Sequence, residues 1–146
     1  MIIYVASSWR NATQPAVVQA LRSAGHQVYD FRNPRPGDHG FHWSEIDPNW
    51  EQWEPGEYRE HLGHRIAIRG FASDMGALEC CDAVVAVQPF GRSASLELGW
   101  ACGAGKKTIL LLAPGEPELM VKMCDHLALS LDEVLRFLED LPAVHS

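Results

Sequence analysis

Glu97 is the residue whose surroundings in the sequence point most directly to chemistry. It lies between Leu96 and Leu98, in a predicted helix that is otherwise apolar or built of small residues. A carboxylate in the first turn of a helix ordinarily does no more than complement the helix dipole. A carboxylate with apolar neighbours is instead directed into a cleft, where it could attack an anomeric carbon and form a covalent glycosyl intermediate. Glu97 is therefore the candidate nucleophile, and the dipole role is the plain alternative.

The segment just before this carboxylate has the composition of an anion-binding loop. Gly91 to Ser95 reads GRSAS and precedes the predicted helix, so its free backbone N–H groups and hydroxyls could hold a phosphate. Arg92 and Arg10 could add charge-assisted hydrogen bonds. The segment is neither a Walker A loop nor a GxGxxG loop. Ordinary helix capping by Ser93 or Ser95 explains it equally well.

Asp74 and Tyr4 are two further polar residues that could assist Glu97. Asp74 lies on the helix predicted before the third strand, and Tyr4 lies inside the first predicted strand. Taken alone, Asp74 reads as a surface charge and Tyr4 as a core residue. A buried tyrosine hydroxyl needs a hydrogen-bond partner, however, and the Glu97 carboxylate is a candidate for that role.

The composition and the motifs exclude several classes of protein. The formal net charge of −7 argues against a broad nucleic-acid surface, because such surfaces cluster Lys and Arg. The seven histidines form no HxH or HExxH pattern and no cluster with cysteines, so we predict no metal site and no cofactor. The GxSxG nucleophile elbow of an acyl-transfer triad is also missing.

The elements that must position these residues alternate between strand and helix. The predicted strands are residues 2–6, 26–31, 83–87 and 108–113, with a short fifth at 128–129; the predicted helices are 15–24, 57–81 with a break near Gly70, 96–103, 117–125 and a last one opened by a capping box of Ser130 and Glu133. This order predicts an α/β fold, namely a single doubly wound, flavodoxin- or Rossmann-like three-layer domain over residues 1–146. Its parallel sheet should have about five strands.

In such sheets a ligand binds outside the carboxyl ends of the strands, where the strand order switches. The loops after the first three predicted strands should converge there. The predicted binding residues that follow the first strand are Ser7, Ser8, Trp9, Arg10 and Asn11. Gly91, Arg92, Ser93 and Ser95 follow the third strand and complete the predicted set from these two loops.

The segment 33–56 breaks the pattern and is predicted to be an aromatic-rich insertion or lid. It is rich in proline and glycine, shows no clean period, and carries Trp43, Trp50 and Trp53. A structureless segment of this length in a compact domain is often a binding loop. We predict an aromatic wall over a planar ligand, with Trp43 as a binding residue. The alternative is a loop packed by its own aromatic side chains.

Three blocks of the sequence resemble a known family. They are residues 3–9, IYVASSW; residues 74–87, DMGALECCDAVVAV; and residues 93–107, SASLELGWACGAGKK. The chain resembles the nucleoside 2-deoxyribosyltransferase superfamily, which includes the 2′-deoxynucleoside 5′-monophosphate N-glycosidases and the hydroxymethyl-CMP hydrolases. The last block is the most specific, and together the three frame nearly the whole domain.

The resemblance implies a nucleoside or nucleotide as the small-molecule substrate and a role for each matched residue. It makes Glu97 the nucleophile at C1′, Tyr4 the residue that orients it, and Asp74 the group that helps the base depart. It also implies a homo-oligomer. The transferases of the family carry an acidic residue shortly before the nucleophile, and residues 91–95 have none. This difference favours hydrolysis over base transfer.

Two other functions remain open from the sequence. One is an NAD(P) glycohydrolase of the kind related to Toll/interleukin-receptor domains, which also uses a Glu to break a ribosyl bond. The other is a non-catalytic nucleotide-binding sensor that keeps the pocket without the chemistry. Fold alone does not distinguish these functions.

We also expect a reduced, cytoplasmic protein without a membrane partner. The four cysteines lie in apolar runs, and no pair has CxxC spacing, which is typical of buried free thiols. The N-terminus lacks the basic and apolar regions of a signal peptide. No uninterrupted apolar stretch reaches the ~18 residues that a membrane span needs.

Overall fold

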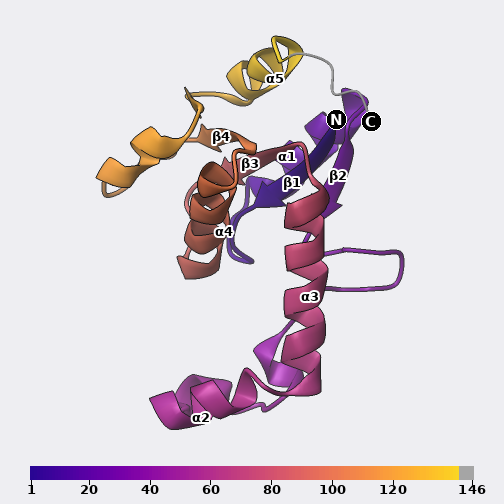
Figure 1. The fold of residues 1–146 in the computed structure, drawn as a ribbon, viewed down its shortest axis with the longest axis vertical. Helices are drawn as coiled ribbons and strands as arrows, with labels where there is room; N and C mark the ends of the chain where they lie inside the picture. The colour runs from indigo at the N-terminus through magenta and orange to yellow at the C-terminus, as the bar shows by residue number, and fades with distance from the viewer. Residues whose placement is uncertain (142–146) are drawn as a thin grey trace.

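The computed structural model describes residues 1–141, so the last five residues of the predicted domain lie outside the described part (Figure 1). In chain order the elements are β1 (Ile2–Ala6), α1 (Gln14–Ser23), β2 (Gln27–Asp30), the 3-10 helices η1 (Trp43–Glu45) and η2 (Trp50–Gln52), α2 (Pro55–His61), α3 (Arg65–Cys80), β3 (Ala83–Val87), α4 (Arg92–Gly103), β4 (Lys107–Leu111), the 3-10 helix η3 (Leu119–Met123), β5 (His126–Ala128) and α5 (Leu131–Glu139).

The five strands form one parallel sheet in the order β2-β1-β3-β4-β5. This is the flavodoxin-like order of a doubly wound fold, in which the chain adds strands first on one side of β1 and then on the other. The predicted α/β fold class is therefore confirmed. The switch in direction lies between β1 and β3, so a crevice is expected at the carboxyl ends of these two strands.

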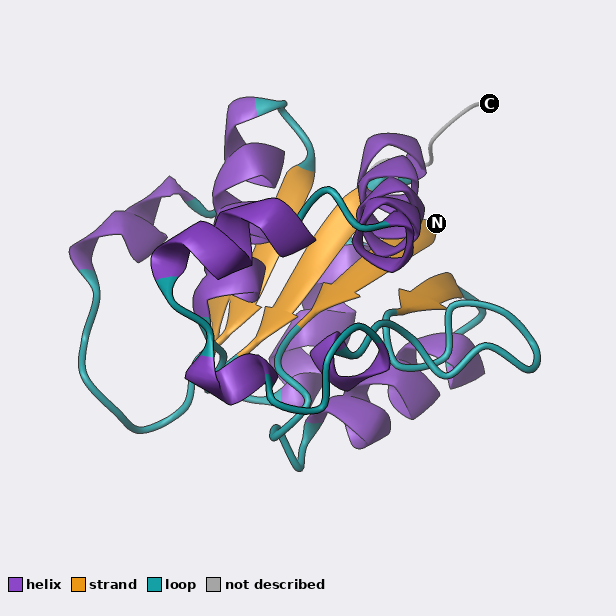
Figure 2. Cartoon of the chain, turned by 90° about the horizontal axis from the view of Figure 1, so that it is seen from below, coloured by secondary structure: helices purple, strands orange, loops and turns teal. Residues whose placement is uncertain are grey.

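Helices cover both faces of the sheet, which makes three layers (Figure 2). Ile3 and Val5 point to the face covered by α1 and α5, whereas Tyr4 and Ala6 point to the face covered by α3 and α4. All five residues of β3 are buried, as expected for a central parallel strand with helices on each side. The catalytic candidates therefore belong to the α3 and α4 face.

The break in the long predicted helix lies before α3 and not near Gly70. Helix α2 ends at His61, and His64 starts α3 by accepting a hydrogen bond from the Ile66 N–H at 3.0 Å. Gly70 lies inside α3, where a Cβ atom would come within 3.0–3.1 Å of the Phe41 side chain. Gly70 thus permits close packing of Phe41 on the helix, and the prediction of a break there was wrong.

The structure differs from the predicted elements at two other helices. Helix α4 begins at Arg92, so most of the predicted Gly91–Ser95 loop is its first turn. The helix predicted at 117–125 is only the short 3-10 helix η3. Ser130 caps α5 as predicted by accepting from the Glu133 N–H, but the Glu133 carboxylate accepts from the Leu129 N–H and not from that of Ser130.

The aromatic residues that follow β2 form a small cluster of their own. We call residues 41–62 the aromatic lobe; Figure 1 shows its helix α2 beyond the end of α3, away from the sheet. The Trp43 ring lies 4.7, 5.6 and 5.8 Å from the rings of Phe41, Trp53 and Tyr58. Trp53 also stacks on His61 at 4.2 Å. Packing of the segment by its own aromatic side chains is therefore what the structure shows.

Gly40 is expected to tolerate no side chain. Its φ is +80°, and a Cβ atom would lie 2.4 Å from the Phe31 carbonyl oxygen and 2.9 Å from the Trp9 ring. We expect Gly40→Ala to lower the free energy of unfolding by about 2–4 kcal/mol, measured by urea denaturation. Gly37→Ala is the matched control, because Gly37 has φ +82° with open space around its Cβ position. It should cost only about 1 kcal/mol. Equal losses would show that backbone strain alone acts at Gly40.

Candidate active site

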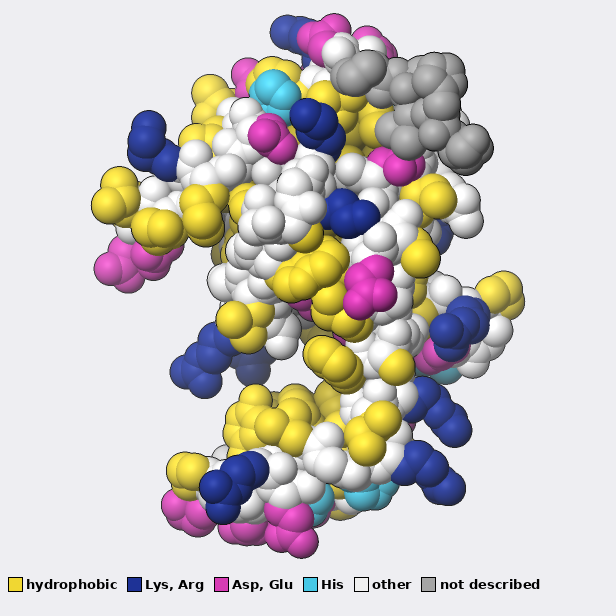
Figure 3. Space-filling view, in the orientation of Figure 1, with side chains coloured by type: hydrophobic (Ala, Val, Ile, Leu, Met, Phe, Trp, Pro, Cys, Tyr) yellow, Lys and Arg dark blue, Asp and Glu magenta, His cyan; other side chains and the backbone are white. Residues whose placement is uncertain are grey.

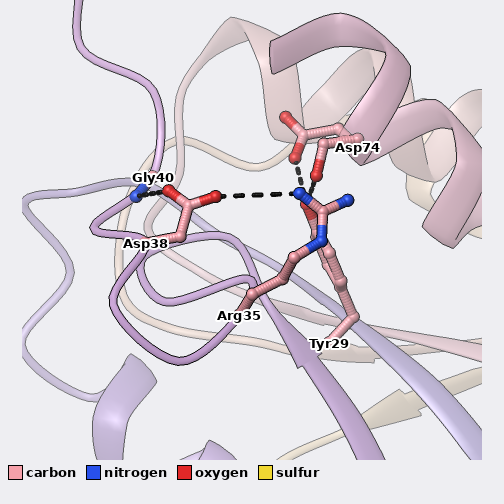
Figure 4. A network of polar contacts seen from close by, with 6 residues as sticks. Tyr29, Arg35, Asp38, Gly40 and Asp74 are labelled. Atoms are coloured by element: carbon pink, nitrogen blue, oxygen red, sulfur yellow. Dashed lines mark hydrogen bonds and ion pairs between the residues drawn. The ribbon is translucent and has the colours of Figure 1, made fainter. Parts of the chain in front are cut away.

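A pair of stacked tyrosines connects the sheet to α3. Tyr4 and Tyr29 are register partners on β1 and β2, so their side chains point to the same face. Their rings stack with centroids 5.2 Å apart and an interplanar angle of 15°. The Tyr29 hydroxyl donates a hydrogen bond of 2.7 Å to the Asp74 carboxylate and lies 2.9 Å from the Ser73 hydroxyl (Figure 4). Asp74 is thereby held beside the tyrosine pair.

Glu97 lies in the second turn of α4, because that helix starts at Arg92 and not at Leu96. The influence of a helix dipole falls off within the first turn, which weakens the plain dipole explanation for Glu97. The pKa of Glu97 is raised to about 8, mainly by burial and also by the charge of Asp74, whereas the neighbouring Tyr4 hydroxyl lowers it. The two carboxylates therefore lie at one site.

The Tyr4 hydroxyl is buried and lacks a hydrogen bond of regular geometry to any described residue. Burial raises the pKa of Tyr4 strongly, and the largest charge that adds to this effect is that of Glu97. The Glu97 carboxylate is thus close to the hydroxyl. Leaving a buried hydroxyl unpaired costs about 1–3 kcal/mol, so a small movement of Glu97 that completes the bond is favourable.

Asp74 also departs from an ordinary surface carboxylate. Its pKa is raised by burial and by the charge of Asp38, although the hydrogen bond from Tyr29 lowers it. Asp38 in turn accepts a hydrogen bond from the Gly40 N–H and lies 3.9 Å from Arg35 (Figure 4). Two neighbouring carboxylates with raised pKa values are a mark of a functional site. Asp74 therefore stands between Glu97 and the charged residues that follow β2.

Asn11 holds two loops together and is not free to bind a ligand. Its side chain is buried, and its amide donates to the carbonyl oxygens of Val87 and Pro89 at 3.0 and 2.9 Å. Its amide oxygen accepts from two backbone N–H groups at the start of α1. In this structure Asn11 therefore has a scaffold role, and its predicted ligand contact stays a prediction. Ser7 makes a similar contact by donating to the Val87 carbonyl at 2.9 Å.

Arg32 clamps the loop after β1, a role that the sequence analysis missed. One guanidinium nitrogen donates to the carbonyl oxygens of Ser8, Trp9 and Asn11 at 2.7, 2.9 and 2.9 Å. The guanidinium also lies over the Trp9 ring, 5.6 Å from its centroid. The Trp9 and Arg10 side chains remain exposed on this loop. Arg32 therefore positions the residues that were predicted to surround a ligand.

Loss of this clamp is expected to loosen the loop. We expect Arg32→Ala to lower the free energy of unfolding by about 2 kcal/mol, because hydrogen bonds from a charged group are lost. Amide hydrogen exchange at residues 8–13 should become faster, as measured by mass spectrometry. Arg22→Ala is the matched control, since Arg22 makes one exposed contact of 3.4 Å to the Val28 carbonyl. If both variants behave alike, Arg32 is not the clamp.

The first turn of α4 presents backbone donors without a side-chain cap. Its N-cap is Gly91, and no side chain accepts from the N–H groups that follow. The Ser95 hydroxyl donates back to the Gly91 carbonyl at 3.0 Å, so it does not cap the N-terminus. Arg92 and Ser93 are exposed. The turn is therefore suited to an anion, as a helix N-terminus generally is.

A cavity of about 500 Å³ opens beside Asp74. Tyr29 and Asp74 line it together with Arg69 of α3 and the segment that follows β2, but Glu97 and Trp43 do not. A separate hollow divides the main body from the aromatic lobe, with basic side chains on its upper rim and hydrophobic ones below (Figure 3). The structure thus brings Tyr4, Asp74 and Glu97 together and leaves Trp43 inside the aromatic lobe.

Within residues 1–141, no group of three or more His, Cys, Asp or Glu side chains is placed to hold a metal ion. None of the helices in that part of the chain is long and apolar enough to cross a membrane.

No family model matches this sequence, and no curated protein matches it. Solved structures do match. A 2-deoxyribosyltransferase from Bacillus psychrosaccharolyticus superposes with a TM-score of 0.62 at 20% identity, over 92% of this chain and 90% of that one. A CMP N-glycosidase from Clostridium botulinum superposes with a TM-score of 0.51 at 18% identity, over 95% of this chain and 98% of that one. The chain therefore has the fold that its resemblance to the deoxyribosyltransferase superfamily predicted.

Proposed function

We propose that the protein is an enzyme that cleaves the N-glycosidic bond of a (deoxy)nucleoside 5′-monophosphate or nucleoside. The observation that carries this proposal is the pairing of Glu97 with Asp74, each with a raised pKa and each beside a tyrosine of the stacked pair. Most enzymes that hydrolyse glycosidic bonds use two carboxylates at one site. The similar folds, which belong to a 2-deoxyribosyltransferase and a CMP N-glycosidase, support the same chemistry.

In this mechanism Glu97 attacks C1′ as the bond from C1′ to the base breaks through an oxocarbenium-like state. Asp74, which lies at the same site, relays a proton from solvent to the departing base. The product of this step is a glycosyl ester on Glu97 and a neutral free base. A water molecule then attacks C1′, passes one proton to Asp74, and releases the sugar and the Glu97 carboxylate. Tyr4 orients that carboxylate throughout.

Hydrolysis of a 5′-monophosphate is favoured over base transfer between nucleosides. Residues 91–95 contain no acidic side chain to recognise or activate an incoming base. The uncapped first turn of α4, with Arg92 and Ser93 exposed there, offers donors to a phosphate. The exposed Arg10 on the loop after β1 could add a second positive charge. A phosphate at this turn would hold the sugar near Glu97, which lies one turn further along α4.

We also propose that the enzyme is a homo-oligomer. Helices α3 and α4 expose Ile68, Phe71, Leu96 and Trp100, which is an unusual amount of apolar surface for a small protein. The spacings within each helix, three on α3 and four on α4, put each pair on one face. Sedimentation velocity of the purified protein tests this proposal, and a monomer at all concentrations would contradict it.

Chromatographic detection of free base tests the proposed reaction. The purified protein is incubated with each ribo- and deoxyribonucleoside 5′-monophosphate, with the matching nucleosides and with NAD, and Glu97→Ala serves as the control. We expect base release from at least one monophosphate and none with the variant. Release of nicotinamide from NAD would indicate the NAD(P) glycohydrolase. Nucleotide binding without any turnover would indicate the sensor, and equal release by Glu97→Ala would reject Glu97 as the nucleophile.

A further inference from the structure

The sheet sets the position of the Tyr29 ring. Tyr29 and Tyr4 are register partners on the parallel strands β2 and β1, and neighbouring strands lie about 4.8 Å apart. Their stacked rings have centroids 5.2 Å apart, which is close to this strand spacing. Tyr4 is fully buried, so the ring on which Tyr29 stacks is itself fixed by the packing of the core. The Tyr29 hydroxyl is therefore a fixed point at the edge of the candidate site.

The Tyr29 hydroxyl engages one oxygen of the Asp74 carboxylate. It donates to Oδ1 at 2.7 Å and lies 2.9 Å from the Ser73 hydroxyl, which can donate to it in turn (Figure 4). The other oxygen of Asp74, Oδ2, accepts no hydrogen bond within residues 1–141 and is not a buried atom. A short bond from a hydroxyl to a carboxylate is strong and directional. It orients the Asp74 carboxylate and leaves Oδ2 as the oxygen that can exchange a proton.

The cavity of about 500 Å³ brings solvent to this carboxylate. Tyr29, Ser73 and Asp74 line it together, and residues 34–41 form another part of its wall. Asp74 also lies close enough to Glu97 for its charge to raise the pKa of that carboxyl group. Glu97 does not line the cavity. Asp74 is therefore the carboxylate that is shared by the solvent of the cavity and the site of the nucleophile.

We propose that Tyr29 is a positioning residue of the glycosidic reaction: its hydroxyl holds Oδ1 of Asp74 so that Oδ2 relays a proton from the solvent of the cavity to the departing base. This inference rests on the proposed function. One proton moves from solvent to Oδ2, and from Oδ2 to the base as the bond from C1′ to the base breaks. Tyr29 keeps its own proton throughout, since burial raises the pKa of its hydroxyl well above the ordinary value.

A double-mutant cycle tests whether Tyr29 acts through Asp74. Tyr29→Phe keeps the ring that stacks on Tyr4 and removes only the hydroxyl. We expect it to lower kcat about 10-fold with KM nearly unchanged, because a misplaced general acid loses part of its usual contribution of about 10²–10⁴-fold. In the Asp74→Asn background the same substitution should change kcat by less than about twofold. Tyr58→Phe is the matched control, since Tyr58 is an exposed tyrosine of the aromatic lobe, and it should keep the wild-type rate.

A titration of the Asp74 carboxyl group provides a second readout that needs no substrate. Burial raises the pKa of Asp74, and the hydrogen bond from Tyr29 opposes this shift. Tyr29→Phe removes a bond to the ionised form, so the pKa of Asp74 should rise. Carbon-13 NMR of protein labelled at the aspartate carboxyl groups measures it, and Asp74→Asn identifies the signal by its loss. The charges of Asp38 and Glu97, which also act at this site, are the same in the wild type and in Tyr29→Phe.

The outcomes separate failure of this inference from failure of the proposed function. Absence of base release by the wild type from every substrate would reject the proposed function, and with it any role of Tyr29 in the reaction. Where the wild type does release base, an unchanged pKa of Asp74 in Tyr29→Phe overturns the inference alone. A loss of kcat that is as large in the Asp74→Asn background as in the wild type also overturns it, because a residue that only supports the fold behaves in that way.

Discussion

Glu97→Gln is expected to lower the rate of base release by about 10³-fold or more while the protein stays folded. The glutamine side chain has nearly the same shape as glutamate but is a very poor nucleophile, so the covalent step should be lost. A carboxylate that merely stabilised charge at the site would leave more activity behind when replaced by an amide. Initial rates with the substrate identified in the base-release assay measure the effect.

Glu79→Gln is the matched control for this variant. Glu79 is an exposed carboxylate on α3, and its backbone carbonyl, which Lys106 contacts, is unaffected by the substitution. We expect wild-type rates from it. Circular dichroism of both variants separates loss of chemistry from loss of fold. Retention of wild-type turnover in Glu97→Gln would reject the assignment of Glu97 as the nucleophile.

The strands that carry the candidate site could be predicted because they are continuous apolar runs. Residues 2–6 and 83–87 have no polar interruption other than Tyr4, as is typical of parallel strands buried on both faces. The convergence of Tyr4 with α3 and α4 follows from the alternation of strands and helices. Asp74 and Glu97 were then selected by residue type and by resemblance, and the structure places both beside the tyrosine pair.

Tyr29 and Arg32 could not be found from the sequence. A tyrosine in a short edge strand looks like any strand residue, and only the register of β1 and β2 shows that it stacks on Tyr4. Arg32 binds three backbone carbonyl groups of residues that precede it by more than 20 positions. Every residue has such a carbonyl group, so the sequence does not show which of them an arginine contacts. Both roles depend on tertiary geometry that residue types do not encode.

Residue type alone also does not settle the roles of Trp43 and Asn11. Aromatic composition does not tell whether rings face a ligand or one another, and at Trp43 the neighbours are Phe41, Trp53 and Tyr58. Asparagine is common both in ligand loops and at helix starts, and Asn11 uses its whole amide to join two loops. In both cases the structural role competes with binding for the same side chain.

The value of kcat/KM is expected to rise with pH up to about 8 and then to level off. The nucleophile must be ionised in the free enzyme, and the pKa of Glu97 is raised to about 8. Below that pH the active fraction falls about tenfold per pH unit, so the rate at pH 6 should be about 100-fold below the plateau. Asp74 and Glu97 interact, so the rise of kcat/KM below pH 8 reports the titration of the pair and not of one residue alone. A flat profile between pH 6 and 8 would contradict a pKa of about 8 for Glu97.

The stability of the protein provides a check on the same pKa that needs no substrate. Glu97 has a pKa of about 8 when folded, against an ordinary value of 4.5. Between these values the folded state binds more protons than the unfolded state, so this group's contribution to stability is full below pH 4.5 and is lost as pH rises to 8. Glu97→Gln removes that loss. The difference in the free energy of unfolding between Glu97→Gln and the wild type should therefore shift by about 3 kcal/mol in favour of the variant between pH 5 and pH 8.

Urea denaturation of both proteins at several pH values measures this gain. Glu79→Gln, which replaces an exposed carboxylate on α3, again serves as the matched control. A gain for Glu97→Gln that is constant with pH would mean that Glu97 is already ionised near its ordinary pKa. The rise of kcat/KM up to about pH 8 would then have to come from the ionisation of another group. If kcat/KM and the free energy of unfolding both change with a pKa of about 8, they report the same group, Glu97. The burial that raises the pKa of Glu97 then destabilises the folded protein at the pH where the nucleophile becomes ionised.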